Sequence, residues 1–248
     1  MMHPFLEKLK IKESLSIAVF LFSFSNLQSQ KVGRVDYTRA PNSYIFDIDA
    51  AIANDYGGLY IPIGKAFDVL TAENYRDLNT AVVAGKLSAS IYWEDVPGLI
   101  KSAKIDGSNG RLGRIKVSID KTKGKGNAVI ALKSNNDIVW SWHAWVTDDP
   151  QFGVEYYHGI RGTEVSGNRF IEQYMDRNLG ATSATPGDIG AFVLLYQWGR
   201  KDLFMGTCAQ SGTTLAASTG TWTTIESSQT VDYAEENPMT YIGSSSGE

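Results

Sequence analysis

The feature that most constrains the fold is one apolar segment, residues 138–146, where three of the chain's six tryptophans fall within six residues. Successive side chains of an extended strand point to opposite faces. One face would carry Ile138, Trp140, Trp142, Ala144 and Val146, and the other Val139, Ser141, His143 and Trp145. Because both faces carry large apolar side chains, the segment is predicted to be a central strand of a sheet.

Short alternating segments, separated by Gly, Asn, Asp and Pro, precede this strand. In residues 114–119 the isoleucines and valine would point inward and the charged side chains outward. The Pro within residues 59–63 suits an edge strand or a bulge. About seven such strands at roughly ten-residue spacing indicate a mainly β fold, an antiparallel β-sandwich of immunoglobulin-like or fimbrillin-like type over residues 32–150. The other predicted strands are residues 44–48, 59–63, 87–93, 100–105, 114–119 and 128–132.

The connections between these strands carry turn residues. Residues 107–113, 124–126 and 134–137 are predicted hairpin connections. The glycines of the first two do not match a phosphate-binding loop, which leads from a strand into a helix. One helical insert is expected around residues 72–83, where apolar side chains recur at helical spacing.

The pattern changes after residue 150. A strand is predicted at residues 169–175, and a short helix or buried run at residues 188–198. Residues 211–248 are rich in Ser, Thr and Gly and have few apolar anchors. Residues 151–248 are therefore predicted to form an incomplete α+β module with a Ser/Thr/Gly-rich tail.

The N-terminus has the pattern of an export signal. Lys8, Lys10 and Lys12 precede an apolar run, residues 15–24, that is too short to span a bilayer. We expect residues 1–30 to be a signal peptide, with an uncleaved anchor as the alternative. Later segments are too short or too polar for a transmembrane helix, so the mature chain is expected to be secreted or extracytoplasmic, including display on the outer cell surface.

Charge and cysteine content limit the partners. Loss of the signal removes three lysines and two glutamates and leaves 20 basic and 25 acidic residues, a net charge of −5. A mildly acidic chain without a basic stripe is not expected to bind nucleic acid. The single cysteine, Cys208, cannot form an internal disulfide.

Three segments in this order, residues 140–148, 175–181 and 196–202, resemble a known group of proteins, with support from residues 41–45 and 124–129. The group is the exported Bacteroidetes proteins that carry the Fibrobacter succinogenes major paralogous domain, and their fimbrillin-like relatives. The resemblance covers most of the mature chain. It implies a secreted or surface-displayed protein of a group that is often of unknown function and sometimes linked to adhesion or polysaccharide handling, and it implies no catalytic residues.

The chain departs from that group in two places. The group usually follows its Asn-Pro-Met-Thr segment, here residues 237–240, with a longer module that contains a Cys-Pro-x-Gly-Trp stretch, whereas this sequence stops at Glu248. We therefore expect a C-terminally truncated fragment in which Cys208 lacks a partner. Leu203 stands where the group usually has Pro.

The candidate ligand-binding residues are Trp145 and the two side chains on its face, Ser141 and His143. An exposed indole can stack on a sugar ring, whereas a buried one packs in the core, and both interpretations are open for Trp145. A lone His in a Trp-rich strand is usually a packing residue. No cofactor is expected, although Asp148 and Asp149 are candidate Ca²⁺ ligands, with turn capping as the alternative.

The predicted function is non-catalytic adhesion or glycan binding, with an extracellular glycan or other surface proteins as partners. A structural subunit of a surface fibre is the first alternative. A polysaccharide-active enzyme is the second, and it requires two convergent carboxylates in a cleft. The sequence shows acidic pairs but no spacing that brings two of them together.

Overall fold

The computed structural model describes residues 36–72, 78, 84–150, 152–157, 171–191, 194–197, 200–204 and 223–243. Residues Tyr37–Glu248 form one compact unit, and the domain boundary predicted near residue 150 stays a prediction. Residues 1–30, the predicted export signal, and Cys208 lie outside the described residues. So does most of the predicted helix at residues 72–83, although Leu78 is helical and buried.

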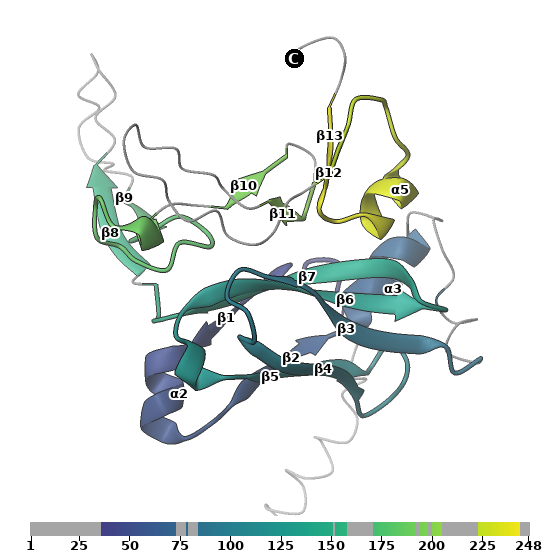
Figure 1. Ribbon diagram of the computed structural model, residues 1–248, viewed down its shortest axis with the longest axis horizontal. Helices are drawn as coiled ribbons and strands as arrows, with labels where there is room; N and C mark the ends of the chain where they lie inside the picture. The colour runs from purple at the N-terminus through teal and green to yellow at the C-terminus, as the bar shows by residue number, and fades with distance from the viewer. Residues whose placement is uncertain are drawn as a thin grey trace, which may run out of the picture. The chain divides into compact units, whose positions relative to one another are not determined.

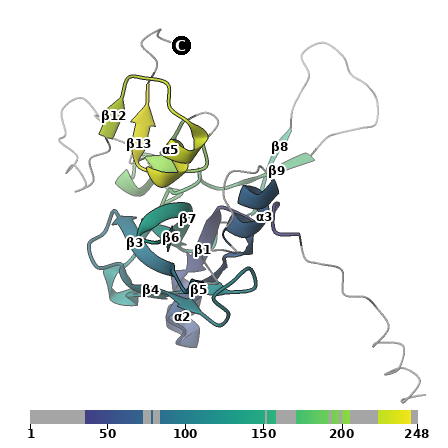
Figure 2. The same ribbon diagram turned by 90° about the vertical axis from the view of Figure 1, so that its right-hand side faces the viewer.

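Two β-sheets enclose one hydrophobic core (Figure 1), and Figure 2 shows the same stacking from the side. The mainly β fold is thus confirmed, while its immunoglobulin-like or fimbrillin-like type stays a prediction. The four-stranded sheet has the order β1 (Ser43–Asp47), β7 (Asp137–Thr147), β6 (Gly126–Ser134) and β3 (Leu87–Glu94). The three-stranded sheet has the order β2 (Gly58–Pro62), β5 (Arg114–Ile119) and β4 (Ile100–Asp106).

Strand β7 lies between β1 and β6, as the prediction of a central strand requires. Its two faces are both buried: Trp142 is 1% exposed in the core between the sheets, and Trp145 on the other face is 0% exposed. β1 runs parallel to β7, with Tyr44 opposite Ala144, so the sheet is not purely antiparallel. The chain between β1 and β7 forms β3 and β6 of the same sheet and all three strands of the second sheet. No hairpin therefore joins β1 to β7, and the long connection allows the two strands to run parallel.

The predicted facing of residues 114–119 is confirmed in β5. Ile115, Val117 and Ile119 are at most 2% exposed and belong to the core. β2 is an edge strand that ends at Pro62, where the missing backbone N–H is tolerated.

Two of the three predicted hairpins are confirmed. Asn135 and Asn136 have φ values of 53° and 79° in the turn between β6 and β7, which a two-residue hairpin of type I′ requires. Residues 107–113 join the antiparallel neighbours β4 and β5. The prediction for residues 124–126 was wrong, because this connection follows the 3₁₀ turn Lys121–Lys123 and crosses from one sheet to the other.

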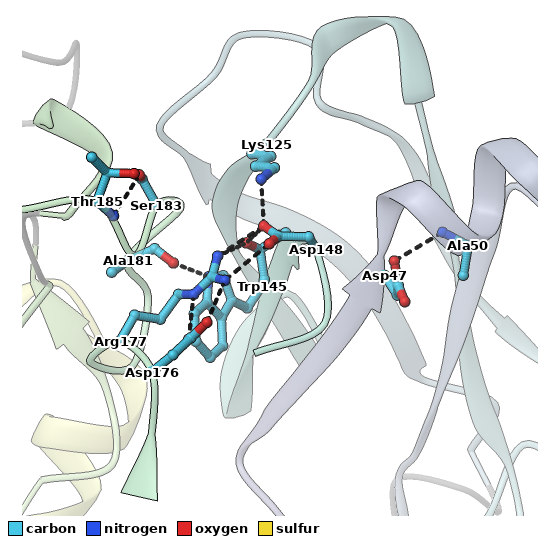
Figure 3. A network of polar contacts seen from close by, with 11 residues as sticks. Asp47, Ala50, Lys125, Trp145, Asp148, Asp176, Arg177, Ala181, Ser183 and Thr185 are labelled. Atoms are coloured by element: carbon cyan, nitrogen blue, oxygen red, sulfur yellow. Dashed lines mark hydrogen bonds and ion pairs between the residues drawn. The ribbon is translucent and has the colours of Figure 1, made fainter. Parts of the chain in front are cut away.

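Two helices were missed by the strand pattern, α2 (Ile48–Asn54) and α3 (Gly64–Ala72). The carboxylate of Asp47 accepts a hydrogen bond of 2.9 Å from the backbone N–H of Ala50 and so caps α2 (Figure 3). The predicted strand therefore ends at residue 47, because an Asp at this position supplies an acceptor for a free N–H of the first helical turn. Ile48 and Ala51 bury one side of α2.

Residues beyond 150 form short elements. The predicted strand at residues 169–175 corresponds to β9. In the described part of residues 188–198, where a helix or buried run is predicted, a 3₁₀ turn is followed by a buried Leu194 and the exposed strand β10, and residues 192, 193 and 198 lie outside the described residues. The elements are β8 (Phe152–Tyr157), β9 (Ile171–Met175), the turn Ile189–Ala191, β10 (Leu195–Tyr196), β11 (Leu203–Phe204), β12 (Thr223–Ile225), α5 (Val231–Glu236) and β13 (Thr240–Ile242).

In the part of the chain described, every helix is too short or too polar to cross a membrane.

Trp142→Ala is expected to lower the free energy of unfolding by about 3 to 5 kcal/mol, because it removes a large side chain from the core. Leu112→Ala is the control: Leu112 is 74% exposed, and truncation there should change stability by no more than about 0.5 kcal/mol. Urea unfolding of both variants measures the difference. Equal stabilities would contradict the placement of Trp142 in the core.

Candidate functional site

The three predicted ligand-binding residues lie on the face of β7 that points away from the core between the sheets. Ser141, His143 and Trp145 are 1%, 4% and 0% exposed, so this face is covered as well. Hydrogen bonds join it to residues 176–202 of the second half of the chain. The face is therefore an internal contact between the sheet and that segment.

Trp145 is held on both its edge and its face. Its indole N–H donates to the backbone carbonyl of Ala181 at 3.1 Å (Figure 3). Its ring lies nearly parallel to that of His143, with centroids 6.4 Å apart and an interplanar angle of 18°. The expectation that Trp145 offers a stacking platform to a sugar is corrected on this ground, because a fully buried indole has no open face.

His143 belongs to a buried chain of hydrogen bonds. The side-chain amide N–H₂ of Asn127 donates to Asp95 at 2.8 Å and to the carbonyl of Gly180 at 3.1 Å. The amide oxygen of Asn127 therefore faces His143 Nε2 at 2.9 Å, which makes Nε2 the protonated nitrogen and leaves Nδ1 to accept from the Ser43 hydroxyl at 3.2 Å. Burial lowers the pKa of His143 to about 3, so the ring is neutral.

Asp95 anchors the same chain from the end of β3. It accepts from both the backbone N–H and the side chain of Asn127, at 2.6 and 2.8 Å. Burial nevertheless raises the pKa of Asp95, since these hydrogen bonds offset only part of the cost of removing a carboxylate from water. The carboxylate thus fixes the amide orientation on which the His143 tautomer depends.

A second polar cluster joins Ser141 to Lys201 and Asp202. The hydroxyl of Ser141 donates to Asp202, and the ammonium of Lys201 donates to the Ser141 oxygen at 2.6 Å and to Asp202 at 2.8 Å. Lys201 also lies 4.8 Å from the ring centroid of Trp140. A serine nucleophile needs a neutral base that accepts its proton. Here Lys201 is an ion-paired donor and the serine proton goes to a carboxylate, so the arrangement is a cross-link.

The third cluster lies at the end of β7, around Arg177 (Figure 3). Its guanidinium donates to both oxygens of Asp148 at 2.8 and 2.9 Å and to Asp176 at 2.7 Å, and the ammonium of Lys125 also donates to Asp148. These donors, Arg177 first, lower the pKa of Asp148, and the two carboxylates raise the pKa of Arg177. The Arg177 side chain is only 4% exposed, which makes the carboxylates necessary partners.

The two candidate Ca²⁺ ligands, Asp148 and Asp149, differ in burial and in hydrogen bonding. Both oxygens of Asp148 are engaged by cations, whereas Asp149 is exposed. Among the residues that the structure describes, no group of three or more His, Cys, Asp or Glu is placed to hold a metal ion. A Ca²⁺ site at this pair stays a prediction, and the geometry of Asp148 gives it no support.

A surface that the sequence reasoning did not select is the outward side of the three-stranded sheet. Tyr60 of β2, Lys116 of β5 and Lys104 of β4 are directly opposite one another across the strands, and all three are exposed. The signal for it was the alternation of β5, which places Arg114 and Lys116 outward. What the sequence could not supply was the pairing of β5 with β2 and β4.

Comparisons of the chain with models of known protein families, with curated proteins and with solved structures find no match. The resemblance to exported Bacteroidetes surface proteins therefore stays a prediction.

Replacement of His143 by Gln should flatten the loss of stability in mild acid. An unfolded chain takes up a proton at the ordinary imidazole pKa of 6.5, whereas folded His143 stays neutral down to about pH 3. Its contribution is therefore complete above pH 6.5 and is lost as the pH falls toward 3, at up to about 1.4 kcal/mol per pH unit. Urea unfolding at several pH values between 7 and 5 measures the slope. Identical slopes for the wild type and His143→Gln would refute the buried neutral ring.

Asp148→Asn should destabilise the fold by about 1 to 3 kcal/mol at pH 7, because it removes charge-assisted hydrogen bonds from a buried guanidinium. The lowered pKa of Asp148 means that the contribution of this carboxylate is complete above its ordinary pKa and is lost as the pH falls through the lowered value. The variant should therefore also lose less stability in acid than the wild type. Asp149→Asn, at the exposed neighbour, is the control, and equal unfolding curves for the two variants would contradict the cluster.

Proposed function

We propose that this chain is an exported, non-catalytic protein that binds carbohydrate outside the cytoplasm. The sequence supports export through the predicted signal in residues 1–30, and the resemblance supports a role in adhesion or polysaccharide handling. The observation that carries the proposal is an exposed tyrosine, Tyr60, on the edge strand β2, beside hydroxyl and ammonium groups on the outward face of the three-stranded sheet. An aromatic ring and several hydrogen-bonding groups together are what a sugar needs for recognition.

The geometry around Tyr60 favours such a role. The ring is 46% exposed, and the guanidinium carbon of Arg114 lies 4.1 Å from its centroid. This cation–π contact restrains the ring at the surface, which lowers the entropy lost when a ligand is bound. Ser102 and Ser118 lie opposite each other on the same face, beside Lys104 and Lys116.

The internal clusters support a non-catalytic role. Ser141, His143 and Lys201 are the side chains most suited to nucleophilic or acid–base chemistry in β7 and its surroundings. Each of them is engaged by fixed partners inside the fold, and His143 is neutral with both ring nitrogens in hydrogen bonds. These residues stabilise the contact between the sheet and residues 176–202, so the exposed surface is the better candidate for function.

A structural subunit of a surface fibre is the second candidate, and one observation favours it. Among the residues that the structure describes, β1 is a five-residue edge strand that pairs with β7 alone and runs parallel to it. An edge strand presents unpaired backbone groups to which a neighbouring chain can add. A fibre subunit would form polymers whose size rises with protein concentration, whereas a carbohydrate-binding protein need not.

The proposal is tested by retention of the purified protein on a panel of immobilised neutral and acidic polysaccharides. We expect saturable retention on at least one polysaccharide and competition by the same polymer in solution. Light scattering over a range of concentrations and an assay for released reducing ends run in parallel. Failure to bind any member of the panel, with concentration-dependent polymers, would replace the proposal by the fibre subunit, and release of reducing ends would replace it by the enzyme.

A further inference from the structure

The outward side of the three-stranded sheet presents a row of three side chains. The register places Tyr60 opposite Lys116, and Lys116 opposite Lys104. Neighbouring strands lie about 4.8 Å apart, so the row offers a ring and two ammonium groups at roughly regular intervals. The opposite face of the same strands carries the core residues Ile61 and Val117, and burial on that side fixes which side chains point outward.

The charges of this row are unbalanced. Lys104 and Lys116 are directly opposite each other, and like charges in this position are destabilising. Acids do pair with basic side chains elsewhere on this sheet: Arg114, in the adjacent row, pairs with Asp106 at 2.8 Å, and Lys101 of β4 pairs with Asp120, just beyond β5, at 3.6 Å. Within the described part of the chain, neither Lys104 nor Lys116 has an ion-pair partner.

The excess of positive charge is local to this row, since the whole chain has a formal net charge of −4. The chain has more acidic than basic residues, and in the adjacent row Asp106 neutralises Arg114, whereas Lys104 and Lys116 have no such acid beside them. An anionic group that bridges the two ammonium groups would relieve their repulsion and gain two charge-assisted hydrogen bonds. The row therefore fits a ligand that carries negative charge close to an apolar surface.

We infer that the face defined by Tyr60, Lys104 and Lys116, the basic face, binds an acidic polysaccharide. A sugar ring stacks on the free side of Tyr60, opposite Arg114, and carboxylates of the neighbouring units contact Lys116 and Lys104. This inference rests on the proposed function and names its ligand class. Each exposed ion pair contributes little on its own, and a repeating polymer gains affinity by engaging several contacts at once.

The test compares two ligands that differ only in charge. Polygalacturonate carries a carboxylate on every unit, and its fully methyl-esterified form has the same backbone without that charge. The purified protein is expected to bind polygalacturonate at about 0.15 M salt, to bind the ester much more weakly, and to lose affinity as salt is raised. Calorimetry or retention on immobilised polymer measures both.

Lys104→Glu is the decisive variant. It should weaken binding to polygalacturonate by roughly tenfold or more, since it places a negative charge against the ligand. It also creates an opposite-charge pair with Lys116 across the strands, so the melting temperature should stay unchanged or rise. Lys86→Glu is the matched control: it makes the same change in net charge at an exposed lysine outside the basic face. Tyr60→Ala should weaken binding to both forms of the polymer.

Three outcomes would overturn the inference. Equal binding of polygalacturonate and its ester would show that charge is not recognised, while the proposed function would stand. Equal losses for Lys104→Glu and Lys86→Glu would show that the ligand binds elsewhere. Binding of single-stranded DNA as strong as that of polygalacturonate would show a general attraction for polyanions. Retention on no polysaccharide of the panel is a different result, because it removes the proposed function itself.

Discussion

The burial of β7 on both faces is the constraint on which the rest of the structure depends. One face, with Trp142, closes the core between the two sheets, and the other, with Ser141 and His143, meets residues 176–202. Polar groups are costly to bury unless they have hydrogen-bond partners. The second half of the chain supplies such partners, and so it is held to the sheet by specific contacts as well as by apolar area.

This constraint also bears on function. Among the described residues, two side chains of β7 that could take part in catalysis have partners inside the fold: His143 is neutral and hydrogen-bonded, and Ser141 shares the carboxylate of Asp202 with Lys201. The outward side of the three-stranded sheet, where Tyr60 and the two opposed lysines are exposed to solvent, is therefore the surface that we propose for ligand recognition. Trp145 is buried, whereas Tyr60 is exposed, and the lysines near Tyr60 favour an acidic ligand in the proposed carbohydrate binding.

Much of the strand content could be predicted, because apolar and polar side chains alternate along a strand wherever one of its faces is buried and the other is exposed to solvent. β5 shows this most clearly, since Ile115, Val117 and Ile119 are internal and Arg114 and Lys116 are exposed. The pattern failed at residue 48, where a capping Asp47 turns the chain into a helix while the apolar spacing still resembles a strand. Within residues 188–198 the described residues form a 3₁₀ turn and the short exposed strand β10, and Leu194 between them is buried.

The sequence by itself determined that β7 is a central strand, that its two faces both carry apolar side chains, and that a turn of two asparagines joins it to β6. These are local properties, set by alternation and by backbone conformations that Asn tolerates. Only the tertiary structure decided that Trp145 is buried, that Asp148 accepts hydrogen bonds from Arg177, and that Lys104 lies opposite Lys116. Each of these depends on which distant segment packs against a given face, and that choice is made by pairing and burial across the whole chain.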